Sequence, residues 1–541
     1  MINLKRNGFI EGAVITTVAI FISKILGMVY VIPFYSIVGE QGGALYGYAY
    51  NVYNLFLIVS TAGIPLAISK LTSEYDSLGM IADKEKMYKV ARNCILVFAV
   101  LSFLLCFIFA PLIAKLIIGD MVGGNTIEDV TFVIRAVSFG LLVVPFLSVI
   151  RGYLQGHKYM RAPAISQVIE QFVRVLVIVG GSYFALKVFR LSITETMGIV
   201  VFSATAGAII AYFYLLHIFR KNKEKVFPKN SDASQVSTKE IVKKVITYSI
   251  PFIIISISNN IYYNINMVLV IRIMTKLGYD ALTTETVSSI FTTWGTKICM
   301  IVISIATGIM TSLIPHVVSS YVKGKMDEVN IQFNKSLKAI QLVIVPTALF
   351  ISLTSGSVWL LFYENTGVGA NIIKFTILAT ILESAYVILM SLFQGLNKSK
   401  MIYISILLGI GANTILAVPF MLLFNKLGYD AYYGTIFATY IGYSLALLVS
   451  IIYLKKKLGF NLKGSIKLLP KTLFGVLAMV GVSLFISIFF KATDYSRLMQ
   501  LPILAGYGVI LIGIFVLINW KEYKLIIPKK YIDKFTKNKK D

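Results

Sequence analysis

Residues 196–219 read TMGIVVFSATAGAIIAYFYLLHIF, a run without a single Lys, Arg, Asp or Glu. An α-helix rises about 1.5 Å per residue, so roughly 20 apolar residues are needed to cross the hydrocarbon core of a bilayer. This run is long enough, and no side chain in it carries a charge that needs water. The stretch therefore predicts a transmembrane helix, and the rest of the chain can be interpreted from it.

The composition of the whole chain agrees with that stretch. Of 541 residues, 57% are hydrophobic and 14% are charged, and the mean hydropathy is +0.80. Soluble domains carry roughly 25% charged residues. A formal net charge of +26 would suggest a nucleic-acid partner on a soluble protein, but on so apolar a chain it indicates cations sorted to one side of a membrane. The three cysteines show no CxxC or His pairing, so neither a disulfide framework nor a zinc site is indicated.

The same window finds fourteen candidate spans, so we expect an all-α polytopic membrane protein. The first span lacks a small-x-small cleavage site and is interpreted as a retained helix, not a signal peptide. The spans cover approximately residues 12–34, 46–69, 92–117, 130–151, 162–187, 196–219, 244–273, 286–314, 338–362, 371–394, 401–424, 431–454, 468–490 and 500–520.

The basic residues predict the orientation of these spans. If the N-terminus is cytoplasmic, the inner loops and tails hold 37 Lys and Arg residues and the outer loops hold 8. This bias follows the positive-inside rule and places both termini in the cytoplasm. The outer cations are Lys187, Arg190, Arg272, Lys276, Lys374, Lys426, Lys491 and Arg497.

A polar, basic linker divides the chain. Residues 220–243, rich in Lys, Asn and Ser, separate a predicted six-helix lobe at 1–219 from a second six-helix lobe at 244–454. Residues 455–541 add two helices and a basic cytoplasmic tail. No segment between the helices is large enough to fold as an extramembrane domain.

Two pairs of short motifs suggest that the lobes repeat each other. Pro65 and Pro315 close equivalent helices, and the Gln-Gly pairs at 155–156 and 394–395 close another equivalent pair. Each motif recurs six helices later, so both copies face the same side of the membrane. This is the pattern of a parallel repeat in transporters. Chance similarity between apolar helices is the alternative.

Six cations fall inside the predicted spans. Each costs at least about 2.5–3.5 kcal/mol there, so such residues normally face a cavity or a partner. Lys115 and Lys471 lie near helix ends, where snorkelling explains them, and for Arg135, near the outer face, both explanations stay open.

The other three cations lie deeper in their helices. Lys24 and Lys297 lie in the middle of their helices without a carboxylate within one turn. Arg174 has Glu170 one turn earlier, an i,i+4 pair that could neutralise it.

Other polar residues inside the spans are candidates for a cavity lining. Glu383 is a lone acid that we expect to pair with a lysine across the cavity or to hold a coupling cation. In the seventh span Asn259, Tyr263 and Asn266 share one helical face, which we expect to line water, substrate or another helix. Further candidates for cation coupling are Asn264, Asn413 and Thr439.

The sequence contains no catalytic constellation. Its three histidines lie near helix ends without a clustered acid or cysteine, and it has no Walker A Gly-Lys-Ser/Thr loop. We therefore expect a transporter and not an enzyme, without a cofactor or a metal. Membrane potential, Na⁺ or H⁺ would then supply the driving force.

Four stretches carry a family resemblance: SKILG (23–27), STAGIPLAISK (60–70), RGYLQGHKYMRAPAISQVIEQFVR (151–174) and SLIP (312–315). With these residues the chain resembles the multidrug/oligosaccharidyl-lipid/polysaccharide exporter superfamily. Within it, the chain is similar to the polysaccharide-transporter branch that includes Gram-positive lipid II flippases and the stage V sporulation protein B. The likeness covers all fourteen spans, the last two by hydropathy alone.

The resemblance implies two pseudo-symmetric six-helix lobes in a V around a cationic cavity, with helices thirteen and fourteen forming an extra groove. It implies alternating access for a lipid-linked, pyrophosphate-bearing sugar in the bacterial cell membrane. Lys24 occupies the position of a basic cavity residue in the first helix, and Lys297 lies within about one residue of such a position in the eighth. Tyr30 and Tyr46 stand where Gram-negative relatives carry an Arg and an Asp.

We therefore expect Lys24 and Lys297, helped by Arg174 and with Arg135 as a further candidate, to attract the pyrophosphate of lipid II. The expected partners are this anionic lipid-linked sugar and membrane lipids, with the cell-wall synthesis machinery as a candidate, no nucleic acid, and a monomeric chain. One alternative is a flippase for another lipid-linked glycan, from capsule, teichoic acid or spore. Others are a multidrug/cation antiporter, which typically has twelve helices and a first-helix acid, and a membrane glycosyltransferase or acyltransferase.

Overall fold

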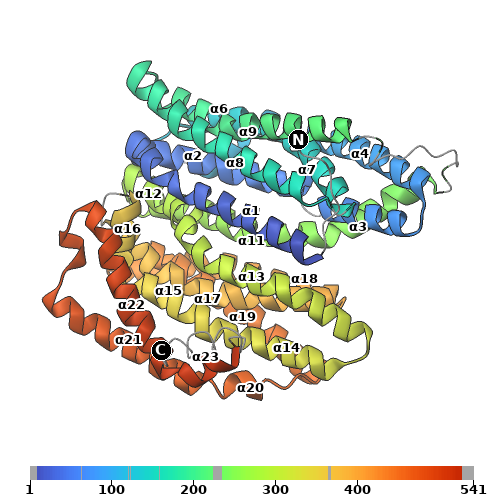
Figure 1. Cartoon of the computed structure of the whole chain (residues 1–541). Coiled ribbons are helices and arrows are strands. Elements are labelled where there is room, and N and C mark those ends of the chain that lie inside the picture. The colour runs from blue at the N-terminus through green and yellow to red at the C-terminus, as the bar shows by residue number, and fades with distance from the viewer. Residues whose placement is uncertain are drawn as a thin grey trace, which may run out of the picture. The chain divides into compact units, whose positions relative to one another are not determined.

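Helices are the only secondary structure in the described part of the chain (Figure 1), which confirms the all-α prediction. The computed structural model describes residues 9–61, 64–119, 121, 123–157, 159–222, 224, 234, 236–363 and 367–526. The chain forms two compact units, Met1–Thr293 and Trp294–Asp541.

The described part of the first unit contains eleven α-helices, two of which continue into a wider π-helical turn. Thr126 and Ser192 begin two of them with capping boxes, in which the side chain at N3 bonds back to the capping residue. The elements are α1 (Phe9–Val29), α2 (Val31–Thr61), α3 (Ile64–Ser77), α4 (Ile81–Ile108), α5 (Ala110–Ile118), α6 (Ile127–Ser138), α7 (Gly140–Gly156), α8 (Arg161–Tyr183) with η1 (Phe184–Val188), α9 (Ile193–Lys221), α11 (Thr238–Lys276) and α12 (Ala281–Ser289) with η2 (Ile290–Trp294).

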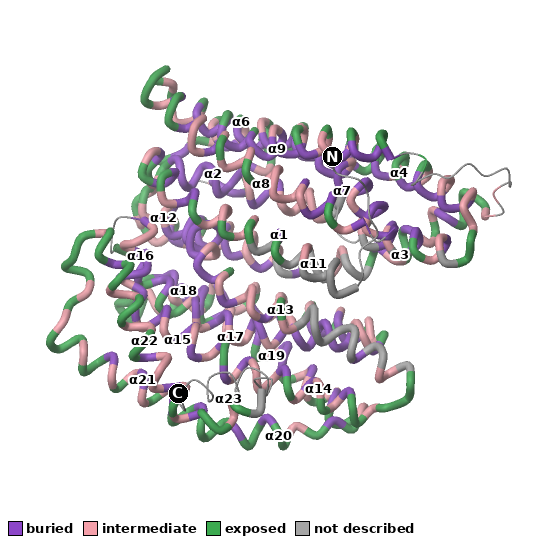
Figure 2. The backbone as a smooth tube through the Cα atoms, in the orientation of Figure 1, coloured by how far each residue is buried: buried purple, intermediate pink, exposed green. Residues whose placement is uncertain are grey.

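Within this unit α8 packs along α9 and against α1, and α7 packs against α3, α4 and α9. α11 contacts α2, α3, α4 and α5, and α12 contacts α2. Large apolar side chains such as Leu71, Met87, Leu147 and Tyr153 are fully buried between these helices. Figure 2 shows buried residues where helices meet and exposed residues on the opposite faces. Many of those exposed residues are apolar, as expected where a helix faces lipid.

The second unit is built in the same way from long apolar helices. α13 packs on α17, α18 packs on α19, and α21 and α22 pack on each other and on α15. Leu349, Leu468, Met479 and Phe515 are buried where the last two spans meet the rest of the unit. The elements are α13 (Gly295–Val322), α14 (Met326–Ala339) with η3 (Ile340–Ile344), α15 (Val345–Leu353), α16 (Ser355–Tyr363), α17 (Val368–Gly395), α18 (Ser399–Lys426), α19 (Tyr432–Lys457), α20 (Lys463–Ile466), α21 (Leu469–Phe489), η4 (Ala492–Asp494), η5 (Arg497–Met499), α22 (Gln500–Ile518) and α23 (Trp520–Ile526).

Each of the fourteen predicted spans falls on one or more of these helices, but the count of fourteen is not confirmed. Among the described residues eleven helices are long and apolar enough to cross a membrane, or up to twelve with one bent pair. That pair joins Ile22–Val29 to Val31–Ile58 at an angle of 42°. The chain is thus a multi-pass membrane protein with eleven or twelve candidate spans in its described part.

The compact units do not divide at the basic linker. Much of the predicted linker, residues 220–243, lies outside the described residues, and α11 and α12 beyond it belong to the first unit. The predicted lobes at 1–219 and 244–454 therefore remain a prediction. Each of the two Gln-Gly pairs ends a helix, because α7 ends at Gly156 and α17 ends at Gly395.

Candidate functional site

Arg174 combines a positive charge with a buried N–H group that has no hydrogen-bond partner in the described part of the chain. α8 carries this residue, and α8 contacts α1, α2 and α9. The guanidinium carbon lies 5.7 Å from the centre of the Tyr50 ring on α2, within the range of a cation–π contact. Its Nε is buried without a hydrogen-bond partner. Such a group inside a membrane protein is a candidate for binding an anion.

A close helix crossing supports the backbone around Arg174. A Cβ atom added at Gly207 on α9 would lie 2.6 Å from the carbonyl oxygen of Glu170 on α8. That distance is shorter than a carbon–oxygen contact allows, so the two helices can approach this closely only with glycine at position 207. The crossing fixes the part of α8 that carries the site.

Four tyrosines lie in a row next to Arg174. The phenol oxygens of Tyr30 and Tyr46 are 3.2 Å apart, which is hydrogen-bonding distance. The rings of Tyr46 and Tyr50 stack with centroids 5.5 Å apart, and those of Tyr50 and Tyr53 follow at 6.2 Å. The chain thus presents phenol hydroxyls and ring faces beside a cation.

Glu170 does not form the expected i,i+4 ion pair with Arg174. Its Oε2 instead lies 2.9 Å from a guanidinium nitrogen of Arg151 on α7. Arg151 also donates from Nε to the Ser166 hydroxyl over 2.8 Å, so two groups on α8 hold it. The packing of α7 beside α8 supplies this partner, and Arg174 has no ion pair among the described residues.

Lys24 lies on α1, half-buried, on the side of that helix that approaches α8. Gly27, one turn further on, has the side-chain amide of Gln171 on α8 3.3 Å from the place of a Cβ. Residues three apart lie on the same helical face, so Lys24 shares this side. The first unit therefore brings together α1, α2 and α8, which carry Lys24, the tyrosine row and Arg174.

The polar face of the predicted seventh span lies on α11. Asn266 is buried, Tyr263 is half-buried, and Asn264 donates from Nδ2 to the carbonyl of Asn260 over 2.8 Å. The side chain of Asn259 lies outside the described residues. α11 packs against α2, the helix of the tyrosine row.

Two of the predicted residues lie in the second unit on helices that contact each other. Lys297 lies in the first turn of α13 and is half-buried, and Glu383 lies on α17 with 6% of its surface exposed. Glu383 is close enough to Cys299 on α13 to interact electrostatically with its thiol. The buried acid and the cation therefore lie on a shared helix pair.

Asn413 and Thr439 also come together in the second unit. The Thr439 hydroxyl donates to Oδ1 of Asn413 over 3.0 Å, across the contact between α18 and α19. Asn413 is fully buried. This bond joins two helices and satisfies polar groups that would be costly in hydrocarbon.

Arg135 does not join the group around Arg174. It is exposed, donates from Nε to the carbonyl of Phe107 over 3.4 Å, and has its guanidinium carbon 5.2 Å from the Phe107 ring. Of the two predicted snorkelling lysines, Lys471 has a carboxylate partner, with Nζ 3.3 Å from Glu522. Lys115 has none among the described residues.

Glu285 is a buried acid that sequence reasoning missed. It lies on α12 and accepts from the backbone N–H and the side-chain amide of Asn125, each over 3.0 Å. Asp280 caps α12, and hydrogen bonds from Thr283 hold the pKa of Asp280 below its ordinary value. Gly124 lies at φ +70°, and a Cβ there would lie 2.8 Å from Glu285. The sequence signal that could have indicated this buried acid is the position of Glu285 directly before the predicted span 286–314.

Two more hydrogen bonds join the same region to α2. Thr286 donates to the Glu40 carboxylate over 3.1 Å, and Asn51 donates to the Thr293 hydroxyl over 3.2 Å. Together with the Asn125–Glu285 bonds, these contacts hold residues 285–293 against α2 and against the loop before α6. No group of three or more His, Cys, Asp or Glu residues that could hold a metal ion occurs among the described residues.

Comparisons with known proteins agree on one family. The family model "Polysaccharide biosynthesis protein" matches residues 9–320. The lipid II flippase MurJ of Bacillus subtilis (strain 168) is 33% identical over 466 residues, which cover 85% of this chain and 84% of that protein. Stage V sporulation protein B of the same organism is 27% identical over 252 residues, 46% of each chain.

Solved structures show the same fold. A lipid II flippase MurJ in an inward closed conformation matches with a TM-score of 0.68 at 16% identity, covering 95% of this chain and 100% of that one. An inward-facing multidrug resistance transporter of the MATE family matches with a TM-score of 0.63 at 14% identity, over 82% of this chain and 98% of that one. At these identities the likeness extends to the fold and not to the substrate.

Proposed function

Because this chain belongs to the polysaccharide biosynthesis protein family, we propose that it is a flippase for a lipid-linked oligosaccharide. Its substrate on this proposal is lipid II, the undecaprenyl-pyrophosphate-linked peptidoglycan precursor. Alternating access would carry it from the inner to the outer leaflet. The observation that carries the proposal is the 33% identity to a lipid II flippase over most of both chains.

The arrangement around Arg174 supports an anionic substrate. Arg174 has a buried N–H without a hydrogen-bond partner among the described residues, and Glu170, the nearest acid along its helix, pairs with Arg151. A pyrophosphate would supply an acceptor for this N–H. A guanidinium binds phosphate oxygens through directed N–H donors, whereas a lysine acts as a mobile point charge. We assign the first contact to Lys24 and Lys297 and the directed hydrogen bonds to Arg174.

The tyrosine row suits the sugar that follows the pyrophosphate. Aromatic faces and hydroxyl groups are the usual protein surfaces for a ring that is apolar on its face and polar at its edge. Tyr46 and Tyr50 offer a stacked pair of faces beside Arg174. We assign them to substrate contact, with Tyr263 and Asn266 on α11 as further lining.

For the driving force we propose membrane potential or a coupled cation, Na⁺ or H⁺. Glu383 is the acid best placed to hold a proton or a cation, because it is buried on the helix that packs against α13. We assign the hydrogen-bonded pair Asn413–Thr439 and the amide of Asn264 as neutral oxygen ligands for Na⁺.

The charge pattern supports the orientation. With 37 loop and tail cations on one side and 8 on the other, we place both termini in the cytoplasm of a bacterial cell. We take a single chain as the transport unit and the cell-wall synthesis machinery as its partner in the cell.

A different lipid-linked glycan is the second candidate, because the relatives include a sporulation protein. A lipid II accessibility assay separates the two. Cells depleted of their own flippase are complemented with this chain, and lipid II reaching the outer leaflet is measured. Restored exposure supports the lipid II assignment, and its absence in cells with normal amounts of the protein would favour another glycan.

A further inference from the structure

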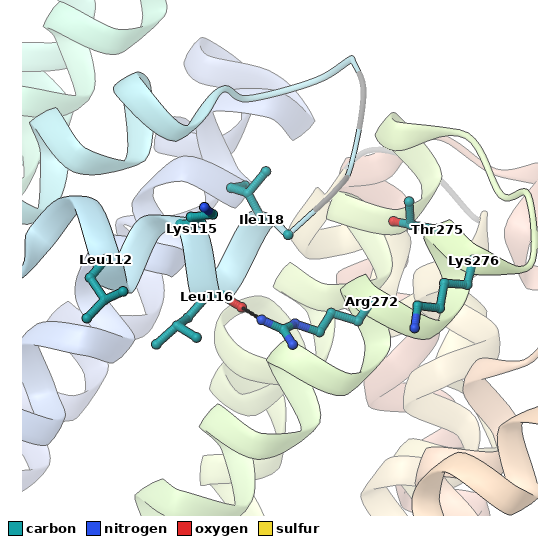
Figure 3. Close-up of a pocket in the computed structure, with 8 residues that line it drawn as sticks. Leu112, Lys115, Leu116, Ile118, Arg272, Thr275 and Lys276 are labelled. Carbon is teal, nitrogen blue, oxygen red and sulfur yellow. Dashed lines mark hydrogen bonds between the residues drawn. The ribbon is translucent and has the colours of Figure 1, made fainter.

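A hollow of about 330 Å³ between α5 and α11 is lined by three cations. Lys115 comes from α5, and Arg272 and Lys276 come from the end of α11 (Figure 3). These residues lie far apart in sequence but meet here because α11 packs against α5. We call this hollow the α5–α11 pocket.

No acid balances these charges in the part of the chain that the structure describes. Arg272 donates one guanidinium nitrogen to the carbonyl of Leu116 over 3.2 Å, as Figure 3 shows. Lys115 and Lys276 are exposed, and neither forms a hydrogen bond or an ion pair with a described residue. Among the described residues the pocket is therefore a concentration of positive charge without a compensating acid.

Helix ends account for part of this arrangement only. Lys115 lies in the last turn of α5 and Lys276 in the last turn of α11, where a cation is favoured by roughly 0.3–1 kcal/mol. That preference acts on each helix separately. It does not explain why two helix ends and an arginine bring like charges to one hollow, where they repel one another. An anion in the pocket would turn this repulsion into attraction.

The distribution of charge along the chain makes the pocket stand out further. The positive-inside pattern leaves 8 loop cations on the outer side, and Arg272 and Lys276 are two of them. Lys115 lines the pocket with them, although snorkelling requires only that it lie near a helix end. Cations are thus few on the outer side, yet three cations lie together in this one pocket.

The apolar wall of the pocket indicates what kind of anion it takes. Leu112 and Leu116 line the pocket beside the cations, and 54% and 49% of their surfaces are exposed. Exposed leucines on a membrane helix face acyl chains. A soluble anion would gain nothing from them, whereas a lipid would contact cations and leucines together. On the cytoplasmic or matrix side of membranes, basic pockets between transmembrane helices bind anionic lipid headgroups in this way, and the attraction between the charges is the same on either side.

We propose that the α5–α11 pocket binds the phosphodiester headgroup of an anionic phospholipid, whose acyl chains lie along Leu112 and Leu116. Lys115 and Lys276 contribute charge, and Arg272, held by Leu116, contributes a positioned guanidinium. On the orientation given above, the lipid belongs to the outer leaflet. The binding itself depends neither on that orientation nor on the transported substrate.

The test uses the full-length protein in neutral detergent. Dioctanoyl phosphatidylglycerol is titrated in, and apparent affinity is taken from the rise in the midpoint of thermal unfolding. The variant Lys115→Gln/Lys276→Gln removes two charges that hold nothing else in the described protein. The matched control is Lys187→Gln/Lys426→Gln, since both residues are exposed outer lysines in the last turn of a helix.

We expect Lys115→Gln/Lys276→Gln to weaken phosphatidylglycerol binding by about tenfold or more, because each cation near a phosphate contributes roughly one factor of five. The control should bind like the unaltered protein, and Lys115→Arg/Lys276→Arg should retain affinity. Equal losses in both Gln variants, or equal binding of dioctanoyl phosphatidylcholine, would overturn the site. An equal stabilisation by inorganic phosphate alone would overturn the assignment to a lipid.

Discussion

The phenol oxygens of Tyr30 and Tyr46 lie 3.2 Å apart, so these two buried tyrosines form one neutral contact. Neither phenol brings a charge to the site. The positive charge of the site comes from Arg174 on α8 and Lys24 on α1.

This contact predicts a coupling between the two tyrosines. Tyr30→Phe and Tyr46→Phe should each lower the free energy of unfolding by about 1 kcal/mol, since each removes one partner of a buried hydrogen bond. The double variant should cost about as much as one single variant, because the bond is lost only once. Unfolding in mixed SDS micelles measures all four proteins. Additive losses would show that the hydroxyl groups act independently.

Lys24 and Lys297 should both be required for transport. Lys24→Ala or Lys297→Ala should abolish growth of a flippase-depleted strain while the protein remains in the membrane, because the pyrophosphate loses its first cation. Lys426→Ala, which removes an exposed lysine at the end of α18, serves as control and should grow normally. Normal growth with both cavity variants would refute the site assignment.

Arg174 and Arg135 form a natural contrast, because each lies over an aromatic ring on a neighbouring helix. Arg174→Gln should lower the rate of lipid II exposure by tenfold or more, since a desolvated charge–phosphate contact is lost. Arg135→Gln should leave the rate within about twofold, because its side chain is exposed. The accessibility assay measures both. Similar losses in the two variants would contradict the separate roles.

The ion pair between Glu170 and Arg151 should be structural. Glu170→Gln leaves Arg151 without its carboxylate and should destabilise the protein, and Arg151→Gln should do the same from the other side. In the double variant no charge is left unpaired, so the loss should be smaller than the sum by about 1–3 kcal/mol. Thermal unfolding in detergent checks this. A purely additive result would mean that the pair is too well solvated to matter.

Glu285 should stabilise the position of α12. Glu285→Ala removes the acceptor of two buried hydrogen bonds from Asn125, each worth roughly 0.5–1.5 kcal/mol. We expect a lower unfolding midpoint than in Glu128→Ala, which changes an exposed acid in the first turn of α6. Equal midpoints for the two variants would show that the Asn125 bonds add nothing.

The helical class and the positions of the spans follow from sequence because they depend on local physics. A run of apolar residues such as 196–219 has to be a helix in a bilayer, and the Gln-Gly pairs mark the helix ends at Gly156 and Gly395. The number of spans does not follow as directly. α1 and α2 meet at a 42° bend, and hydropathy alone does not show whether such a pair crosses once or twice.

The partners of charged residues could not be predicted, because they are chosen by packing between helices. The i,i+4 spacing favours Glu170 with Arg174, yet Arg151 on α7 is better placed. Lys471 pairs with Glu522, and Lys115 lines one pocket with Arg272, only through contacts between residues far apart in sequence. Glu285 was missed because its burial depends on Asn125, a residue of a distant loop.

The membership of α11 and α12 in the first unit has a consequence for dissecting the gene. A cut within the basic linker would not release two self-sufficient halves, because the piece before it loses the helices that cover α2, α3, α4 and α5. Each piece would expose a face shaped for the other. Two such fragments, made separately in one cell, would have to find each other to work at all, and that makes the linker a natural split point for a two-part reporter of assembly.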